Sequence, residues 1–146
     1  MLKFLVYNHL VGFEIRVKYE MKYVRFVPAG IYNGIIWFLS SGPIFVNIQG
    51  FDKTAHIVEY SVLGFLLAFA LNVSSDNFDK MAKYSVIFGI NTGIIDEIHQ
   101  YFVPGRSMDG IDLFADITGI ASGILVWLML VKLFEIIRSN QIFSRK

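Results

Sequence analysis

The chain has 146 residues, of which 55% are apolar and only 17% charged, and its net charge is +1. Soluble domains are about 45–50% apolar and about one quarter charged, and so small a chain has too much surface to cover with so few charges. The composition therefore indicates a single-domain membrane protein, with membrane lipid as a partner and no nucleic acid. The absence of cysteine excludes disulfides and thiolate metal sites.

Four apolar runs follow one another along the chain, at residues 26–45, 57–73, 81–102 and 113–131. A membrane helix needs about 20 mostly apolar residues. The first and fourth runs meet this requirement, and the second and third meet it if their polar ends lie at an interface or inside the bundle. The sequence therefore predicts an all-α fold, an integral membrane bundle of four transmembrane helices.

Glycine pairs in the last two runs support close helix packing. Gly89 and Gly93 are four residues apart, as are Gly119 and Gly123. Small residues at this spacing allow two helix backbones to approach closely in lipid. We expect these glycines at helix–helix contacts.

The segment before the first run alternates apolar and charged residues over positions 13–23, which is typical of a strand, but a single strand without a partner is not stable. Either residues 1–25 form an amphipathic or disordered cytoplasmic tail, or translation starts at Met21. The expected organisation is this tail, a four-helix membrane domain over residues 26–137, and a basic cytoplasmic tail over 138–146.

Basic residues predict the orientation. If the N-terminus is cytoplasmic, 11 of the 13 basic residues lie inside, and only Lys53 and Arg106 lie outside. Positive charge accumulates on the cytoplasmic side of membrane proteins. The sequence thus predicts a multi-pass protein of the cytoplasmic membrane with both termini in the cytoplasm.

The same topology gathers seven of the 12 acidic residues at the outer face. Within each run their spacing puts them on one helix side: Asp52, His56 and Glu59; Asp96 and Gln100; Asp109, Asp112 and Asp116. Ionisable groups inside apolar segments usually face the bundle interior and find partners there. We therefore predict a small polar pocket in the outer leaflet, formed by Asp52, Lys53, His56, Glu59, Tyr60, Asp96, Glu97, Gln100, Arg106, Asp109, Asp112 and Asp116.

Several of these residues also have a purely structural interpretation. Asp109 and Asp112 suit the N-terminus of a helix, where acids are favoured. Arg106 is suited to contact lipid phosphates. Lys53 is suited to a position within the bilayer from which its charged end extends to the interface. His99 lies one residue away from the Asp96–Gln100 side of its helix, which favours an interfacial position.

Three motifs carry a family resemblance. They are Asp52-Lys53-x-x-His56-x-x-Glu59-Tyr60-x-x-Leu63-Gly64, Asp96-Glu97-x-x-Gln100-x-x-x-Pro104-Gly105-Arg106-Ser107, and Asp109-x-x-Asp112-x-x-Ala115-x-x-x-Gly119. In order and spacing, these motifs resemble those of the VanZ-like family over about residues 28–131, and Ser40-Ser41-x-Pro43 is also similar. The family usually has asparagine where this chain has Asp116, so the pocket here is more acidic.

The resemblance implies a small four-helix membrane protein of the bacterial cell envelope, and the namesake of the family is associated with resistance to the glycopeptide antibiotic teicoplanin. One hypothesis is a protein that binds a lipid head group, a lipid-linked cell-wall intermediate or a lipoglycopeptide. A second is an intramembrane hydrolase or transferase with a divalent metal, for which the candidate ligands are His56, Glu59, Asp96 and Glu97. A transporter is less favoured, because the ionisable residues crowd one face. The sequence leaves open whether the chain is an enzyme.

Overall fold

The computed structural model describes residues 23–42, 51–72 and 77–143. Within these ranges the chain forms four α-helices and no strand: α2 (Val27–Ser40), α3 (Phe51–Asn72), α4 (Phe78–Tyr101) and α5 (Gly110–Phe143). The predicted all-α class is confirmed. The alternating segment before residue 23 and the last three residues lie outside the described part.

Two of the helices are long and apolar enough to cross a membrane, over Lys53–Asn72 and Gly110–Asn140, with mean hydropathies of 1.6 and 2.1. α2 has 14 residues and therefore spans about 21 Å, less than the roughly 30 Å of a hydrocarbon core. α4 has 24 residues but is much less apolar, because it carries charges at both ends. Length and composition thus support two of the four predicted spans.

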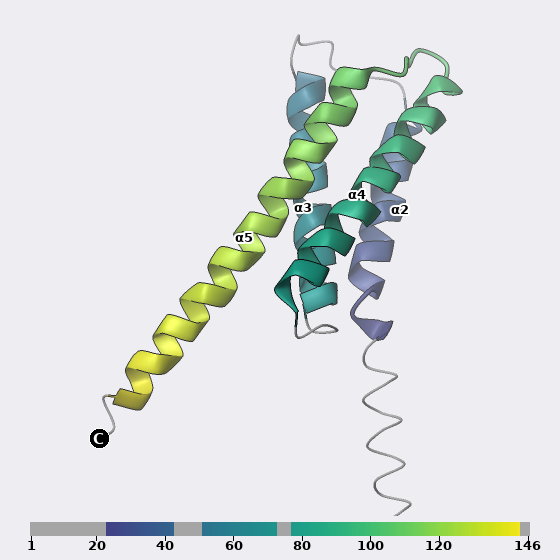
Figure 1. The fold of residues 1–146 in the computed structure, drawn as a ribbon. Helices are drawn as coiled ribbons and strands as arrows, with labels where there is room; N and C mark the ends of the chain where they lie inside the picture. Colours follow the sequence, from purple (N-terminus) through teal and green to yellow (C-terminus); the bar gives the residue numbers. More distant parts are fainter. Residues whose placement is uncertain (1–22, 43–50, 73–76, 144–146) are drawn as a thin grey trace, which may run out of the picture.

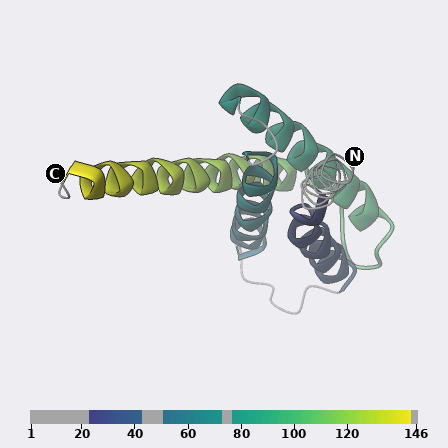
Figure 2. The same cartoon turned by 90° about the horizontal axis from the view of Figure 1, so that it is seen from below.

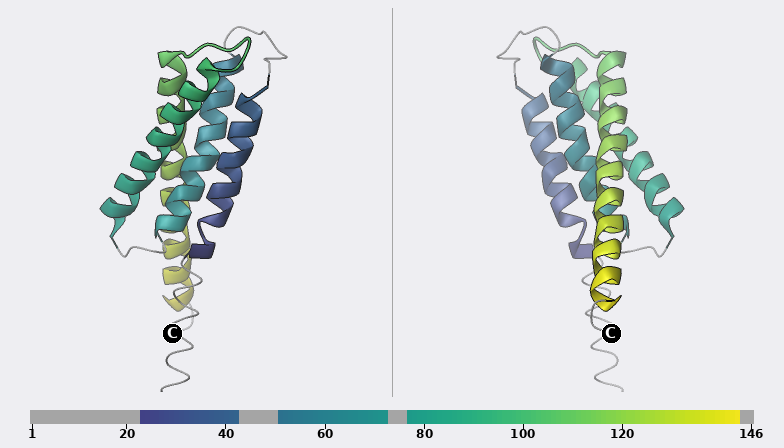
Figure 3. Two further views of the ribbon diagram at one scale, coloured as in Figure 1. Left: turned by 90° about the vertical axis from the view of Figure 1, so that its right-hand side faces the viewer. Right: turned by 90° about the vertical axis from the view of Figure 1, so that its left-hand side faces the viewer.

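Successive helices run in opposite directions, so α2 and α4 end where α3 and α5 begin (Figure 1). α3 packs against each of the other three helices, and α4 also packs against α2 and α5 (Figure 3). α5 is longer than its neighbours and leaves the bundle at its C-terminal end (Figure 2). The described helices therefore share one core and one common end where polar residues can meet.

Small residues bring α3 and α5 into backbone contact. A Cβ atom on Gly119 would lie 2.6 Å from the carbonyl oxygen of Ile57, and one on Gly123 would collide with the carbonyl oxygen of Ser61. From the other side, a Cβ on Gly64 would lie 2.5 Å from the carbonyl oxygen of Ile120. The predicted role of the Gly119–Gly123 pair is confirmed.

The second glycine pair faces α5 side chains. Gly89 packs on Ile120, and a Cβ on Gly93 would lie 2.9 Å from Oδ2 of Asp116. This pair, too, lies at a helix contact, as predicted. Because residue 93 is glycine, there is room beside the buried carboxylate of Asp116.

The outer surface of the bundle is apolar. Phe38, Phe114 and Phe134 are 77%, 72% and 69% exposed, and only 17% of the most apolar window of α5 is buried. Soluble monomers rarely expose large contiguous apolar patches. An apolar helix with this much uncovered surface has the character of a membrane helix rather than of a soluble core.

Candidate functional site

Buried polar side chains gather at the end of the bundle where α2 and α4 finish and α3 and α5 begin. Of the eight polar or charged residues that are buried in the described part of the chain, only Ser85 lies elsewhere. The other seven define what we call the polar end: Ser40, His56, Asp96, Glu97, Gln100, Asp112 and Asp116. Charges buried among apolar helices need partners.

A tight turn aligns α4 and α5 at the polar end. The backbone N–H of Arg106 donates to the carbonyl of Val103 at 3.0 Å, with Pro104 and Gly105 between them. Gly105 has a φ of +86°, which the third residue of a type II turn requires and which glycine adopts without strain. The Pro-Gly pair thus returns the chain so that the first acids of α5 face those of α4.

A lysine joins the starts of α3 and α5. Nζ of Lys53 donates to Oδ2 of Asp109 at 3.0 Å and to Oδ1 of Asp112 at 2.8 Å. The Asp112 side chain is buried, whereas those of Lys53 and Asp109 are each 39% exposed. Lys53 therefore neutralises a buried acid from a position that solvent still reaches.

Asp109 also caps α5. Its Oδ1 accepts the backbone N–H of Ile111 at 2.9 Å, the interaction expected of an acid just before a helix. This hydrogen bond, together with the one from Lys53, holds the pKa of Asp109 below its ordinary value. The predicted helix-N-terminal role of Asp109 is confirmed.

Glu97 ties α4 to the same helix start. Its Oε2 accepts the backbone N–H of Asp109 at 2.8 Å. The side chain is 1% exposed, and Oε1 has no hydrogen-bond partner among the described residues. An unpaired buried polar atom costs about 1–3 kcal/mol, so this oxygen is a position where a ligand or a proton is expected.

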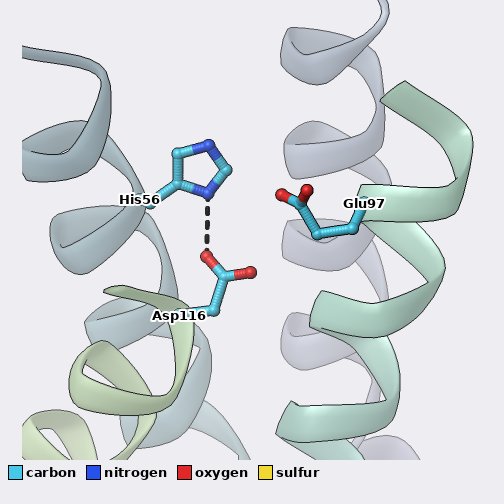
Figure 4. Close-up of side chains that lie close together, drawn as sticks. All are labelled: His56, Glu97 and Asp116. Carbon is cyan, nitrogen blue, oxygen red and sulfur yellow. Dashed lines mark hydrogen bonds and ion pairs between the residues drawn. The ribbon is translucent and has the colours of Figure 1, made fainter. Parts of the chain in front are cut away.

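His56 and Asp116 form the deepest pair (Figure 4). Nδ1 of His56 lies 2.8 Å from Oδ1 of Asp116. Both side chains are nearly inaccessible, and Oδ2 of Asp116, like the hydroxyl of Tyr60, is buried without a partner in the described structure. Figure 4 shows the Glu97 carboxylate pointing toward this pair. Ligand-type atoms of His56, Glu97 and Asp116 all lie within 4.8 Å of one another.

Asp96 is satisfied by different neighbours. Oγ of Ser40 donates to its Oδ1 at 2.6 Å, and Nε2 of Gln100 donates to its Oδ2 at 2.9 Å. Asp96 also lines a cleft of about 50 Å³ between α2 and α4, with Asn33, Ile36, Trp37, Thr92 and Ile95. The hydrogen bond from Ser40 therefore holds α2 on α4, whereas the one from Gln100 lies within α4.

Three further contacts fasten the C-terminal end of α2 and the two residues after it to the polar end. The Trp37 and His99 rings stack with centroids 4.3 Å apart, and Nε2 of His99 lies 2.9 Å from Oγ of Ser41. Nε of Arg106 donates to the carbonyl of Gly42 at 3.4 Å. His99 thus has a structural role beside α2.

The structure brings most of the predicted pocket residues together, but in separate groups. Lys53, Asp109 and Asp112 form one group, and Asp96 and Gln100 form another with Ser40. Tyr60 is fully buried near His56. Glu59 is half-buried on α3. Asp52 lies in the first turn of α3, and its side chain is outside the described part.

The predicted metal-ligand set and the observed cluster overlap in two residues. His56 and Glu97 belong to both, and Asp116 joins them, whereas Asp96 is taken by Ser40 and Gln100. Helix spacing cannot show which acid of α4 turns toward α5 and which toward α2. In the sequence, the similarity of Ser40-Ser41-x-Pro43 to the family motif indicated that Ser40 matters. Nothing in the sequence indicated that Trp37 stacks on His99.

Fold and site together define a small all-helical protein with membrane-helix character and a cluster of buried charges at one end. The family model described as VanZ/LLP1 matches residues 2–133. The chain therefore belongs to the VanZ/LLP1 family, as the motif resemblance indicated. No curated protein and no solved structure matches it.

Proposed function

We propose that this chain is a multi-pass protein of the bacterial cytoplasmic membrane that binds the head group of an amphipathic envelope molecule at its polar end. Ligands of this class are a lipid head group, a lipid-linked cell-wall intermediate and a lipoglycopeptide antibiotic such as teicoplanin. The observation that carries the proposal is the concentration of buried charge at one end of an otherwise apolar bundle.

The distribution of basic residues supports an outward-facing polar end. Within the described helices, Lys80 and Lys83 lie at the start of α4, and Lys132 lies in the C-terminal part of α5, all away from the polar end. These positions suit the cytoplasmic side. In this topology α2 and α4 also cross the membrane, α2 through locally thinned lipid because its helix spans only about 21 Å, and the polar end opens to the outer leaflet.

The rim of the polar end offers groups for recognising a head group. Lys53 and Asp109 remain partly exposed although they are paired, and Arg106 is half-buried in the neighbouring loop. Charge-assisted hydrogen bonds from lysine and arginine suit phosphate or carboxylate, and carboxylates suit amines. A charged head group would exchange with the Lys53–Asp109 pair while its acyl chains lie along the apolar surface.

A binding experiment with matched variants tests this proposal. The protein is placed in lipid nanodiscs, and its melting temperature is measured with and without teicoplanin. We expect stabilisation by the ligand, lost in Arg106→Ala and Glu59→Gln but kept in the controls Arg138→Ala and Glu135→Gln, which change exposed residues at the far end of α5. Equal stabilisation of all four variants would place binding elsewhere. Absence of stabilisation by teicoplanin and by undecaprenyl phosphate would refute head-group binding.

A second function is favoured by one specific observation. A histidine paired with an aspartate and facing a glutamate is an arrangement suited to general acid–base or metal-assisted chemistry. The alternative is therefore an intramembrane hydrolase or transferase acting on a lipid-linked substrate. Release of inorganic phosphate from undecaprenyl diphosphate, lost in His56→Gln, would favour this alternative over binding alone.

A further inference from the structure

Three buried side chains from three helices converge at the polar end (Figure 4). His56 on α3, Glu97 on α4 and Asp116 on α5 have ligand-type atoms within 4.8 Å of one another, and none is more than 4% exposed. We propose that this cluster binds a divalent transition-metal ion. The proposal goes beyond head-group binding and does not depend on it.

The unpaired oxygens point to a cation. Oε1 of Glu97 and Oδ2 of Asp116 are buried and find no hydrogen-bond donor in the described part of the chain. Two carboxylates held this close repel each other unless a positive charge lies between them. Of the basic side chains described near them, Lys53 is bound to two other aspartates and Arg106 donates to a backbone carbonyl. His56 meets Asp116 at Oδ1, and Oδ2 of Asp116 and Oε1 of Glu97 are left without a partner in the described structure. A metal ion would satisfy both oxygens at once.

The donor set selects the class of ion. One imidazole nitrogen with two carboxylate oxygens suits zinc, manganese or iron, whereas magnesium and calcium prefer oxygen alone. Ligands of a tetrahedral zinc ion at 2.0–2.2 Å lie about 3.3–3.6 Å apart. The ligand atoms lie within 4.8 Å of one another, and Nδ1 of His56 lies 2.8 Å from Oδ1 of Asp116. Metal binding at these distances therefore needs the wider separations to close by about 1 Å and this contact to open by about 0.5–0.8 Å, through side-chain rotations.

The surroundings hold the ligands in place. The backbone N–H of Asp109 fixes the other oxygen of Glu97, and the space beside Oδ2 of Asp116 exists because residue 93 is glycine. Metal sites depend on such supporting contacts to orient their ligands. Three protein ligands also leave at least one coordination position for water or for an oxygen of a bound head group.

Metal binding by the full-length protein tests the proposal directly. Detergent-solubilised protein is stripped with EDTA, incubated with zinc chloride, desalted and assayed by mass spectrometry for retained metal, and its affinity is measured by calorimetry. We expect about one zinc ion per chain and a rise in melting temperature on zinc addition. His56→Gln, Glu97→Gln and Asp116→Asn should each weaken binding roughly tenfold or more.

Two controls at the same end separate the cluster from its neighbours. His99→Gln removes an imidazole that stacks on Trp37, and Asp96→Asn alters a buried acid whose oxygens are already bonded. Both should retain zinc as the wild type does. Failure of the wild type to retain zinc, or equal loss of zinc in His99→Gln and His56→Gln, would overturn the proposal.

If circular dichroism shows that a ligand variant does not fold, Gly93→Ala serves in its place, because its new methyl group would crowd Asp116. If the wild type retains zinc but is stabilised neither by teicoplanin nor by undecaprenyl phosphate, only the head-group proposal is refuted.

Discussion

Adding a single methyl group at Gly119 tests how closely α3 and α5 approach. A Cβ at this position would lie 2.6 Å from the carbonyl oxygen of Ile57 and 3.0 Å from the backbone nitrogen of Ser61, whereas ordinary contacts begin at 3.4 Å. Because both atoms belong to the backbone, no side-chain rotation relieves the clash. In Gly119→Ala the two helices must therefore separate by about 0.8 Å, the difference between these distances.

The loss of stability expected in Gly119→Ala follows from a comparison with a matched control variant, Gly34→Ala. Overpacking a well-packed contact costs about 1–3 kcal/mol, while alanine gains up to about 1 kcal/mol over glycine in a helix. Gly34→Ala in α2 has the same gain without the clash, because nothing lies within 4 Å of its new Cβ. The free energy of unfolding of Gly119→Ala should therefore be about 1–3 kcal/mol below that of Gly34→Ala.

Unfolding in mixed micelles of dodecyl maltoside and sodium dodecyl sulfate, followed by circular dichroism, measures this difference. The separation of α3 and α5 should also affect the contact between His56 and Asp116, because Asp116 lies one helical turn before Gly119. A separation of 0.8 Å takes the 2.8 Å contact between His56 and Asp116 beyond hydrogen-bond length, so zinc affinity should fall as well. If both glycine variants unfold at the same detergent fraction, the close approach of the two helices is refuted.

Three further predictions concern topology, pH and the space beside the acid cluster. The chain contains no cysteine, so in intact cells Ser107→Cys should react with an impermeant thiol reagent and Ser139→Cys should not; the reverse pattern would invert the orientation. Because the pKa of Asp109 is held below its ordinary 3.8, the stability from its carboxylate is present above about pH 4 and lost as the pH falls through its folded-state value. Asp109→Asn should accordingly lower the melting temperature at pH 7, and its melting temperature should fall less than that of the wild type as the pH is lowered. A plot of melting temperature against pH that runs parallel to that of the wild type would contradict this prediction. Gly93→Ala should lower zinc affinity more than stability, because its methyl group meets side-chain ends of Asp116 and Leu113; unchanged zinc binding would contradict the crowding.

Much of the fold follows from the sequence because the relevant signals are local. Apolar runs predict the four described helices, and the Pro104-Gly105 pair predicts the turn between α4 and α5. Glycines at four-residue spacing predict the close contacts that Gly119 and Gly123 make. The end of α2 also has a sequence signal, because Pro43 marks the end of the first helix and α2 ends at Ser40. The apolar run, which continues to residue 45, suggests the length of a membrane helix, and the 14 residues of α2 do not reach that length.

The partners within the polar end were harder to predict, because they depend on helix rotation. Asp96 and Glu97 are adjacent in sequence and point about 100° apart on a helix. One therefore meets Ser40 of α2, while the other reaches the start of α5. The sequence places both at the same depth, yet nothing in their spacing says which of the two faces His56.

The contrast between these adjacent acids bears on whether the polar end has more than a structural role. Replacing a buried charge pair with well-packed apolar residues is often neutral or stabilising, so a bundle that needed only stability had little reason to keep this cluster. A polar residue that serves structure alone should have its hydrogen-bonding atoms satisfied, and Asp96 meets that standard with both oxygens. Glu97 and Asp116 each leave a buried oxygen unpaired within the described structure. A ligand is therefore expected beside these two acids rather than at Asp96.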